Sequence, residues 1–105
     1  MHHRPVTAAV SCVHRSMNER SQRLAPALSA SMSCECECTR TECASTFQIA
    51  MGDYDTLRSH GRFFAVVAGH ESREETVVTR RPAYLVIEKS GDPGRSALLL
   101  DPRAR

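Results

Sequence analysis

Three cysteines at alternate positions, followed closely by a fourth, have a spacing that suits the binding of a metal ion. The segment "SCECECTRTEC", residues 33–43, contains Cys34, Cys36, Cys38 and Cys43. If residues 34–38 are extended, side chains alternate with a period of two, so the three thiols project to one side and Glu35 and Glu37 to the other. Converging thiolates suit a metal ion, and zinc takes thiolate and imidazole ligands tetrahedrally.

Two ligand sets are compatible with this spacing. In the first, the four clustered cysteines bind one metal ion. In the second, three cysteines bind together with His70 of "AGHES", a loop that follows an apolar stretch and in which Gly69 would let the backbone approach closely. The familiar C-x2-C pair is absent. Free thiols, a redox pair and an iron–sulfur cluster are the alternatives, although iron–sulfur sites usually use other cysteine spacings.

The remaining cysteine and histidines carry weaker signals. Cys12, His2, His3 and His14 lie in an N-terminal segment without clear periodicity, and we expect no role for them. His60 falls at the end of a predicted helix, where an imidazolium interacts favourably with the helix dipole.

Residues 1–32 differ in character from the rest of the chain. They are rich in serine, alanine, arginine and histidine, and Pro26 would strain a helix formed by residues 18–28. We therefore expect a flexible N-terminal extension that is disordered or loosely helical. Met17 opens the sequence M-N-E-R, so the true start could lie there, with residues 1–16 as an upstream extension.

Residues 33–103 form the predicted folded domain. Four short runs rich in apolar, aromatic and β-branched residues predict strands at 47–50, 62–69, 75–81 and 83–89. Asp53 is a good N-cap for a helix that Gly61 would close, residues 90–94 read as a loop, and residues 95–103 as one helical turn. The expected fold class is α+β: a small three- to four-stranded, mainly antiparallel sheet with one short helix and a cysteine-rich, metal-stapled turn.

A domain of this size has little core to stabilise it. Aromatic residues make up only 5% of the chain, and at about 70 residues a single core rarely supplies more than about 3–5 kcal/mol. A structural zinc ion is worth on the order of 10 kcal/mol in small metal-folded peptides. The thin core and the dense cysteines together predict a structural Zn²⁺.

Charge and hydropathy limit the compartment and the partners that we expect. The net charge is +2 with both signs interspersed, and Glu71, Glu74 and Glu75 interrupt the arginines that could form a basic edge, so nucleic acid is an unlikely partner. These arginines are Arg58, Arg62, Arg73, Arg80 and Arg81. Neither a membrane span nor the apolar core of a signal peptide is evident, which leads us to expect the reducing cytoplasm, where clustered cysteines are more often metal ligands than disulfides.

Three segments resemble a group of small, functionally uncharacterised bacterial proteins from high-GC genomes. The segments are "CECTRTEC" (36–43), "YDTLRSHGRFFAVVAGHE" (54–71) and "YLVIEK" (84–89), and the family pattern is C-E-C-x4-C, F-x-V-x-P-G-H-E and Y-x-V-V-E-K. Ala68 stands where the pattern has proline. The resemblance favours Met17 as the start, and it implies the metal ligands Cys36, Cys38, Cys43 and His70, with Cys34 as the alternative fourth ligand.

The resemblance supplies no activity, so function rests on the site itself. A Cys3His site has no open position for water or substrate, and the chain lacks a catalytic triad or phosphate loop. We expect a non-catalytic zinc-binding module that contacts another protein, and the edge strands of its small sheet could also pair two copies as a homodimer. The alternatives are a thiol or metal redox sensor and a weak nucleic-acid binder.

Overall fold

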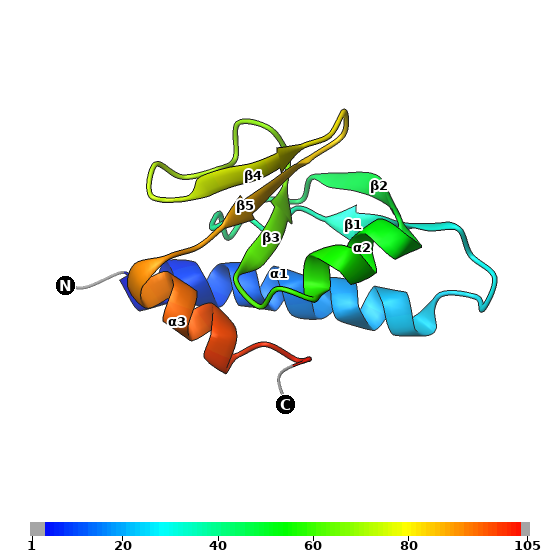
Figure 1. Cartoon of the computed structure of the whole chain (residues 1–105), viewed down its shortest axis with the longest axis horizontal. Coiled ribbons are helices and arrows are strands. Elements are labelled where there is room, and N and C mark those ends of the chain that lie inside the picture. Colours follow the sequence, from blue (N-terminus) through cyan, green and yellow to red (C-terminus); the bar gives the residue numbers. More distant parts are fainter. Residues whose placement is uncertain (1–3, 104–105) are drawn as a thin grey trace.

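The computed structural model describes residues 4–103, and within that range it contains three helices and two small antiparallel sheets (Figure 1). In chain order these are α1 (Arg4–Leu24), β1 (Ser31–Glu35), β2 (Thr46–Ala50), α2 (Met51–Arg58), β3 (Phe63–Val66), β4 (Thr76–Arg80), β5 (Leu85–Glu88) and α3 (Gly91–Leu99). The predicted α+β class with small antiparallel sheets is confirmed. Among the described helices, none combines the length and apolar character needed to cross a membrane.

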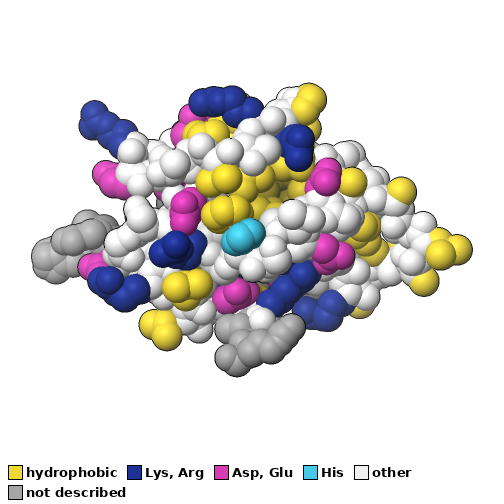
Figure 2. Space-filling model, viewed as in Figure 1, with side chains coloured by type: hydrophobic (Ala, Val, Ile, Leu, Met, Phe, Trp, Pro, Cys, Tyr) yellow, Lys and Arg dark blue, Asp and Glu magenta, His cyan; other side chains and the backbone are white. Residues whose placement is uncertain are grey.

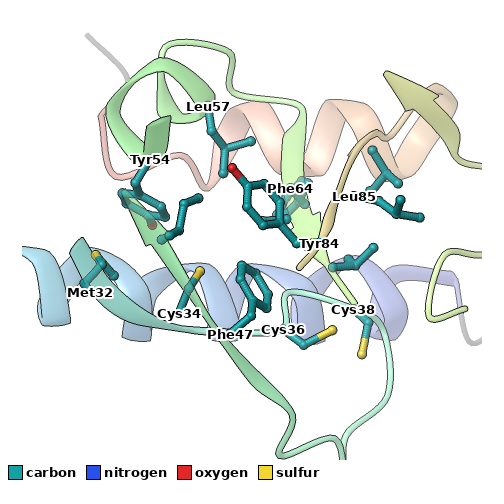
Figure 3. Packing of buried hydrophobic residues seen from close by; sticks show 14 of the residues in the cluster. Met32, Cys34, Cys36, Cys38, Phe47, Tyr54, Leu57, Phe64, Tyr84 and Leu85 are labelled. Atoms are coloured by element: carbon teal, nitrogen blue, oxygen red, sulfur yellow. The ribbon is translucent and has the colours of Figure 1, made fainter. Parts of the chain in front are cut away.

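The strands divide into two sheets rather than one. β1 pairs with β2, and the second sheet has the order β3-β5-β4. β1 and β2 bury alternate residues, so Met32 lies opposite Ile49 and Cys34 opposite Phe47 on the inner face. In β5 the buried residues are the alternate ones, Leu85 and Ile87, as the two-residue period of a strand requires. Figure 3 shows Met32, Cys34, Phe47 and Leu85 in one core with Tyr54, Leu57 and Phe64. Ile49 and Ile87 belong to the same cluster.

The N-terminal segment is where the fold differs most from expectation. Residues 4–24 form a continuous helix that packs against β1 and α3, so of the two expected states the segment takes the helical one and is part of the fold. α1 ends before Pro26, which removes the strain expected from that proline. Periodicity was hard to see because the face that α1 buries is largely polar. Among residues 8–24, the buried ones are Ala8, Ser11, Cys12, His14, Arg15, Asn18 and Glu19.

Arg15 shows how a polar helix face can pack inside a protein. Its guanidinium donates to the carbonyl of Gly61 (2.8 Å) and to that of Ala97 (2.9 Å), and its Cζ lies 4.8 Å from the centre of the Phe64 ring. One side chain of α1 therefore joins α3, β3 and the turn before β3. Met17 lies inside α1, and a start at that residue stays a prediction.

Both shorter helices begin earlier than predicted. α2 starts at Met51, so Asp53 lies in its first turn, where a carboxylate favours the helix dipole, instead of capping it. α3 starts at Gly91 and includes the segment expected to be a loop, because a proline in the first turn is compatible with a helix.

Gly61 has a role other than the predicted helix closure. α2 ends at Arg58, and Gly61 is not among the described glycines with positive φ, which are Gly69 and Gly91. A Cβ at Gly61 would lie 2.8 Å from side-chain atoms of Leu98 and Asp101. The glycine is therefore needed for the close approach of the end of α3.

Candidate metal centre

The C-E-C segment leaves the first sheet and crosses to the second. The Cys36 N–H still donates to the Ser45 carbonyl (3.0 Å), which extends the pairing of β1 with β2 by one step. One residue later the partner changes, and the Glu37 N–H donates to the carbonyl of Ala65 in β3 (2.8 Å). Cys36 and Cys38 therefore lie at the junction of the two sheets, and both are buried.

A tight turn after β3 places His70 at the same junction. The His70 N–H donates to the Val67 carbonyl (2.9 Å), and Gly69 between them has a φ of 93°. A β-turn with positive φ at its third residue strongly prefers glycine there. A Cβ on Gly69 would meet nothing within 4 Å, so the glycine serves backbone conformation rather than the close approach we expected.

Four ligand atoms converge at this point. His70 Nδ1 lies 3.5 Å from Cys36 Sγ and 3.5 Å from Cys43 Sγ. The three sulfur atoms and one imidazole nitrogen all lie within 4.8 Å of one another, and the residues that supply them are Cys36, Cys38, Cys43 and His70. Cys43 and His70 are half-buried. The second ligand set of the sequence analysis is thus the one that the structure brings together.

Burial and backbone hydrogen bonds act in opposite directions on the pKa values of the three ligand thiols. The Val67 N–H donates to Cys36 Sγ (3.2 Å), yet burial dominates and raises the pKa of Cys36 to about 12. Burial also raises the pKa of Cys38, against a hydrogen bond from the Arg40 backbone. Burial opposes ionisation of Cys43 too, but the Ser45 backbone and the neighbouring thiols outweigh it, and the pKa of Cys43 is lowered.

Glu37 anchors the segment between its two cysteine ligands. It was expected on the outer side of an extended strand, but its side chain is completely buried. Its Oε1 accepts from the Ala65 N–H (2.9 Å), its Oε2 accepts from Asn18 Nδ2 (2.8 Å), and the Arg58 guanidinium lies 3.9 Å away. This carboxylate therefore links α1, α2 and β3 at the metal centre.

Cys34 does not join the four convergent residues. β1 ends at Glu35, and the group whose ligand atoms lie within 4.8 Å of one another does not include Cys34. Figure 3 shows the Cys34 sulfur among the core side chains, with the sulfurs of Cys36 and Cys38 pointing away from it. Burial raises the pKa of Cys34 well above its usual range, which is consistent with a neutral core thiol.

Sequence reasoning missed three residues that support the site. His14 Nδ1 lies 3.1 Å from the Cys38 carbonyl oxygen, which can only accept, so this nitrogen carries the hydrogen. Asn18 donates to the Glu35 carbonyl (2.9 Å) and accepts from the Glu35 N–H (2.7 Å). Arg58, expected on a basic edge, is buried against Glu37. The available signal for these supporting residues was that the face of α1 next to the cysteine cluster is polar.

Comparisons with protein-family models, with curated proteins and with solved structures find no match to this chain. The likeness to the bacterial family therefore remains a prediction, and the geometry of the four ligands is the basis for a function.

Proposed function

We propose that the chain is a zinc-stapled module in which Cys36, Cys38, Cys43 and His70 hold one Zn²⁺. The observation that carries the proposal is the separation of 3.5 Å between His70 Nδ1 and each of two cysteine sulfurs. A tetrahedral ion with Zn–S of about 2.3 Å and Zn–N of about 2.0–2.1 Å requires S···N separations of about 3.5 Å. Small side-chain adjustments would complete the tetrahedron.

The compactness of the cluster favours a single ion over an iron–sulfur cluster. All four ligand atoms lie within 4.8 Å of one another, so they surround one point. A two-iron cluster needs its ligands divided into two pairs, one for each iron. Three thiolates and an imidazole are also the donor set that zinc prefers.

A bound ion would join three separate segments of the chain: the C-E-C segment, the loop before β2 and the turn after β3. In small metal-folded peptides such an ion contributes on the order of 10 kcal/mol. All five cysteines are free thiols, so no disulfide occupies the four proposed ligands. Four protein ligands leave no open position, so the proposed role is structural and the module non-catalytic.

The proposed activity of the module is to contact another protein. Figure 2 shows an apolar hollow at the centre of one face, over the three-stranded sheet and beside α2. The hollow has a volume of about 130 Å³, and its apolar lining is Leu57, Phe63, Tyr84 and Val86, with Asp53, His60 and Arg81 among the polar residues. Such a volume suits one inserted side chain better than a free ligand, whose pockets are usually larger than about 300 Å³.

Cobalt substitution tests the proposed site. Titrating Co²⁺ into metal-free protein should give the visible absorption bands of tetrahedral Co²⁺ and thiolate charge-transfer bands. Both should saturate at one equivalent of Co²⁺ per chain. His70→Ala should weaken or abolish these bands, whereas Cys34→Ala should leave them unchanged. Octahedral spectra, or bands that depend on Cys34, would exclude the proposed ligand set.

A thiol sensor is the second candidate, and the observation that favours it is the half-buried Cys43 with its lowered pKa. Peroxide would oxidise two thiolates to a disulfide and be reduced to water, which would release the ion. Zinc release should be followed with a chromogenic chelator, before and after added reductant. If added reductant restores zinc binding, the result favours the sensor. Irreversible loss of zinc favours a purely structural ion.

A further inference from the structure

α1 runs alongside β1, and one of its side chains covers the edge of the strand that does not pair with β2 (Figure 1). Neighbouring residues of a strand direct their backbone groups to opposite edges. The Cys36 N–H donates to the Ser45 carbonyl beside β2, whereas both backbone groups of Glu35 bond to Asn18. Asn18 accepts from the Glu35 N–H (2.7 Å) and donates to the Glu35 carbonyl (2.9 Å), so its carboxamide takes the place of a partner strand.

The same carboxamide also reaches Glu37. Asn18 Nδ2 lies 2.8 Å from Glu37 Oε2, in addition to its bond with the Glu35 carbonyl. The oxygen and both N–H groups of this completely buried amide are therefore used. Because Glu35 and Glu37 flank Cys36, one side chain of α1 holds the chain on both sides of a candidate metal ligand.

His14 holds the next ligand of the segment. It lies four residues before Asn18, a spacing that places both side chains on one face of the helix, and both are buried. His14 Nδ1 donates to the carbonyl oxygen of Cys38 across 3.1 Å. This bond fixes the peptide plane that follows Cys38, and so restricts the backbone from which the Cys38 side chain projects.

We propose that Asn18 and His14 are positioning residues of the metal centre, through which α1 determines how tightly the ion is held. This inference rests on the proposed function. Loss of a group that orients a metal ligand typically weakens metal binding about 10- to 100-fold. The coupling is reciprocal, so a bound ion stabilises the contacts between α1 and the C-E-C segment by the same factor.

Arg15 is the matched control on the same helix. It is also completely buried, but its guanidinium donates to the carbonyls of Gly61 and Ala97, which lie outside the C-E-C segment and the turn that carries His70. Arg15→Ala should therefore lower stability without moving a ligand. A measurement of ligand geometry in the folded, metal-loaded protein separates a positioning role from general destabilisation.

Visible spectroscopy of the full chain loaded with Co²⁺ provides that measurement. Asn18→Ala and His14→Ala should each shift or weaken the ligand-field bands, and in chelator competition each should raise the Co²⁺ dissociation constant about 10- to 100-fold. Arg15→Ala should keep the band positions of the wild type. His14→Asn should restore them, because its amide nitrogen can occupy the position of the imidazole Nδ1. The two His14 variants give the answer even if Asn18→Ala does not fold.

The wild-type spectrum separates failure of this inference from failure of the proposed function. Without tetrahedral Co²⁺ bands in wild type, the proposed function fails and the inference fails with it. If wild type has these bands, unchanged spectra and affinities in Asn18→Ala and His14→Ala would overturn the inference and leave the metal site standing. Band shifts of equal size in Arg15→Ala, or no recovery in His14→Asn, would also overturn it.

Discussion

Glu37 and Ala65 are joined by two hydrogen bonds, one in each direction. The Glu37 N–H donates to the Ala65 carbonyl (2.8 Å), and the Ala65 N–H donates to Glu37 Oε1 (2.9 Å). A side chain thus completes a pairing that a neighbouring strand would otherwise make along the edge of β3. Because Cys36 and Cys38 flank Glu37, this contact holds both sulfur ligands in place before a metal arrives.

Replacing the carboxylate should therefore damage both the fold and the site. In Glu37→Gln, an amide nitrogen must face either the Ala65 N–H or the Asn18 amide, and buried Arg58 loses its counter-charge. Removing one partner of a buried ion pair costs roughly 3–5 kcal/mol. Urea unfolding of the zinc-loaded protein measures this loss. Glu35→Gln, two residues earlier in the same segment and half-buried, should cost less than about 0.5 kcal/mol, and equal losses in the two variants would count against the anchoring role.

Two glycines with free space around them separate backbone strain from crowding. A Cβ would meet nothing within 4 Å at Gly52 or at Gly69, but only Gly69 has a positive φ. Gly69→Ala should destabilise the protein by about 1–2 kcal/mol and weaken zinc binding, because it strains the turn that carries His70. Gly52→Ala lies in α2 and should stabilise by about 0.5–1 kcal/mol. Thermal unfolding measures the melting temperature of each variant. A change in the same direction for both variants would refute the turn geometry.

Arg15 tests whether α1 belongs to the folded unit. Arg15→Ala should leave the carbonyls of Gly61 and Ala97 without their donor and remove the contact with Phe64. An unsatisfied buried polar group costs about 1–3 kcal/mol, so the loss should exceed 2 kcal/mol. The control is Arg20→Ala on the exposed face of the same helix. Denaturant unfolding with equal midpoints for both variants would mean that the N-terminal half of α1 contributes little.

Proton release on zinc binding follows from the pKa values at the site. Burial raises the pKa of Cys36 to about 12 and also raises that of Cys38, so both thiols are protonated near pH 7 in the metal-free protein. Zinc binds thiolates, so it must displace these two protons, and its affinity should rise with pH. Calorimetry in buffers of different ionisation enthalpy counts the protons. Fewer than one proton released at pH 7 would mean that the buried thiols are not ligands.

Much of the β structure was predictable because its pattern is local. The alternation in β5 and the runs that became β2, β3 and β4 appear directly in the sequence. α1 was not predictable in the same way, since residues such as Arg15 and Asn18 are buried through partners distant in the sequence. Their burial depends on tertiary contacts with Ala97 and Glu37, which hydrophobic periodicity does not register.

The site was predictable in its residue types and less so in its geometry. Alternation implied one side for three thiols, but the chain leaves the strand after Glu35, which directs Cys34 into the core and turns Glu37 inward. The approach of His70 required a turn whose Gly69 was visible in the sequence, although its reason, a positive φ, was not. The anchoring contacts of Glu37 reach three elements, α1, α2 and β3, and the spacing of residues within one segment does not indicate such contacts.

Native mass spectrometry of the full chain, purified without added zinc, tests the central claim most directly. Wild type should carry one zinc ion per chain, Cys34→Ala should retain it, and His70→Ala should lose it or hold it weakly enough for a chelator to remove. A compact wild-type chain without metal and unaffected by chelator would contradict the account, as would zinc that persists in His70→Ala and is lost from Cys34→Ala.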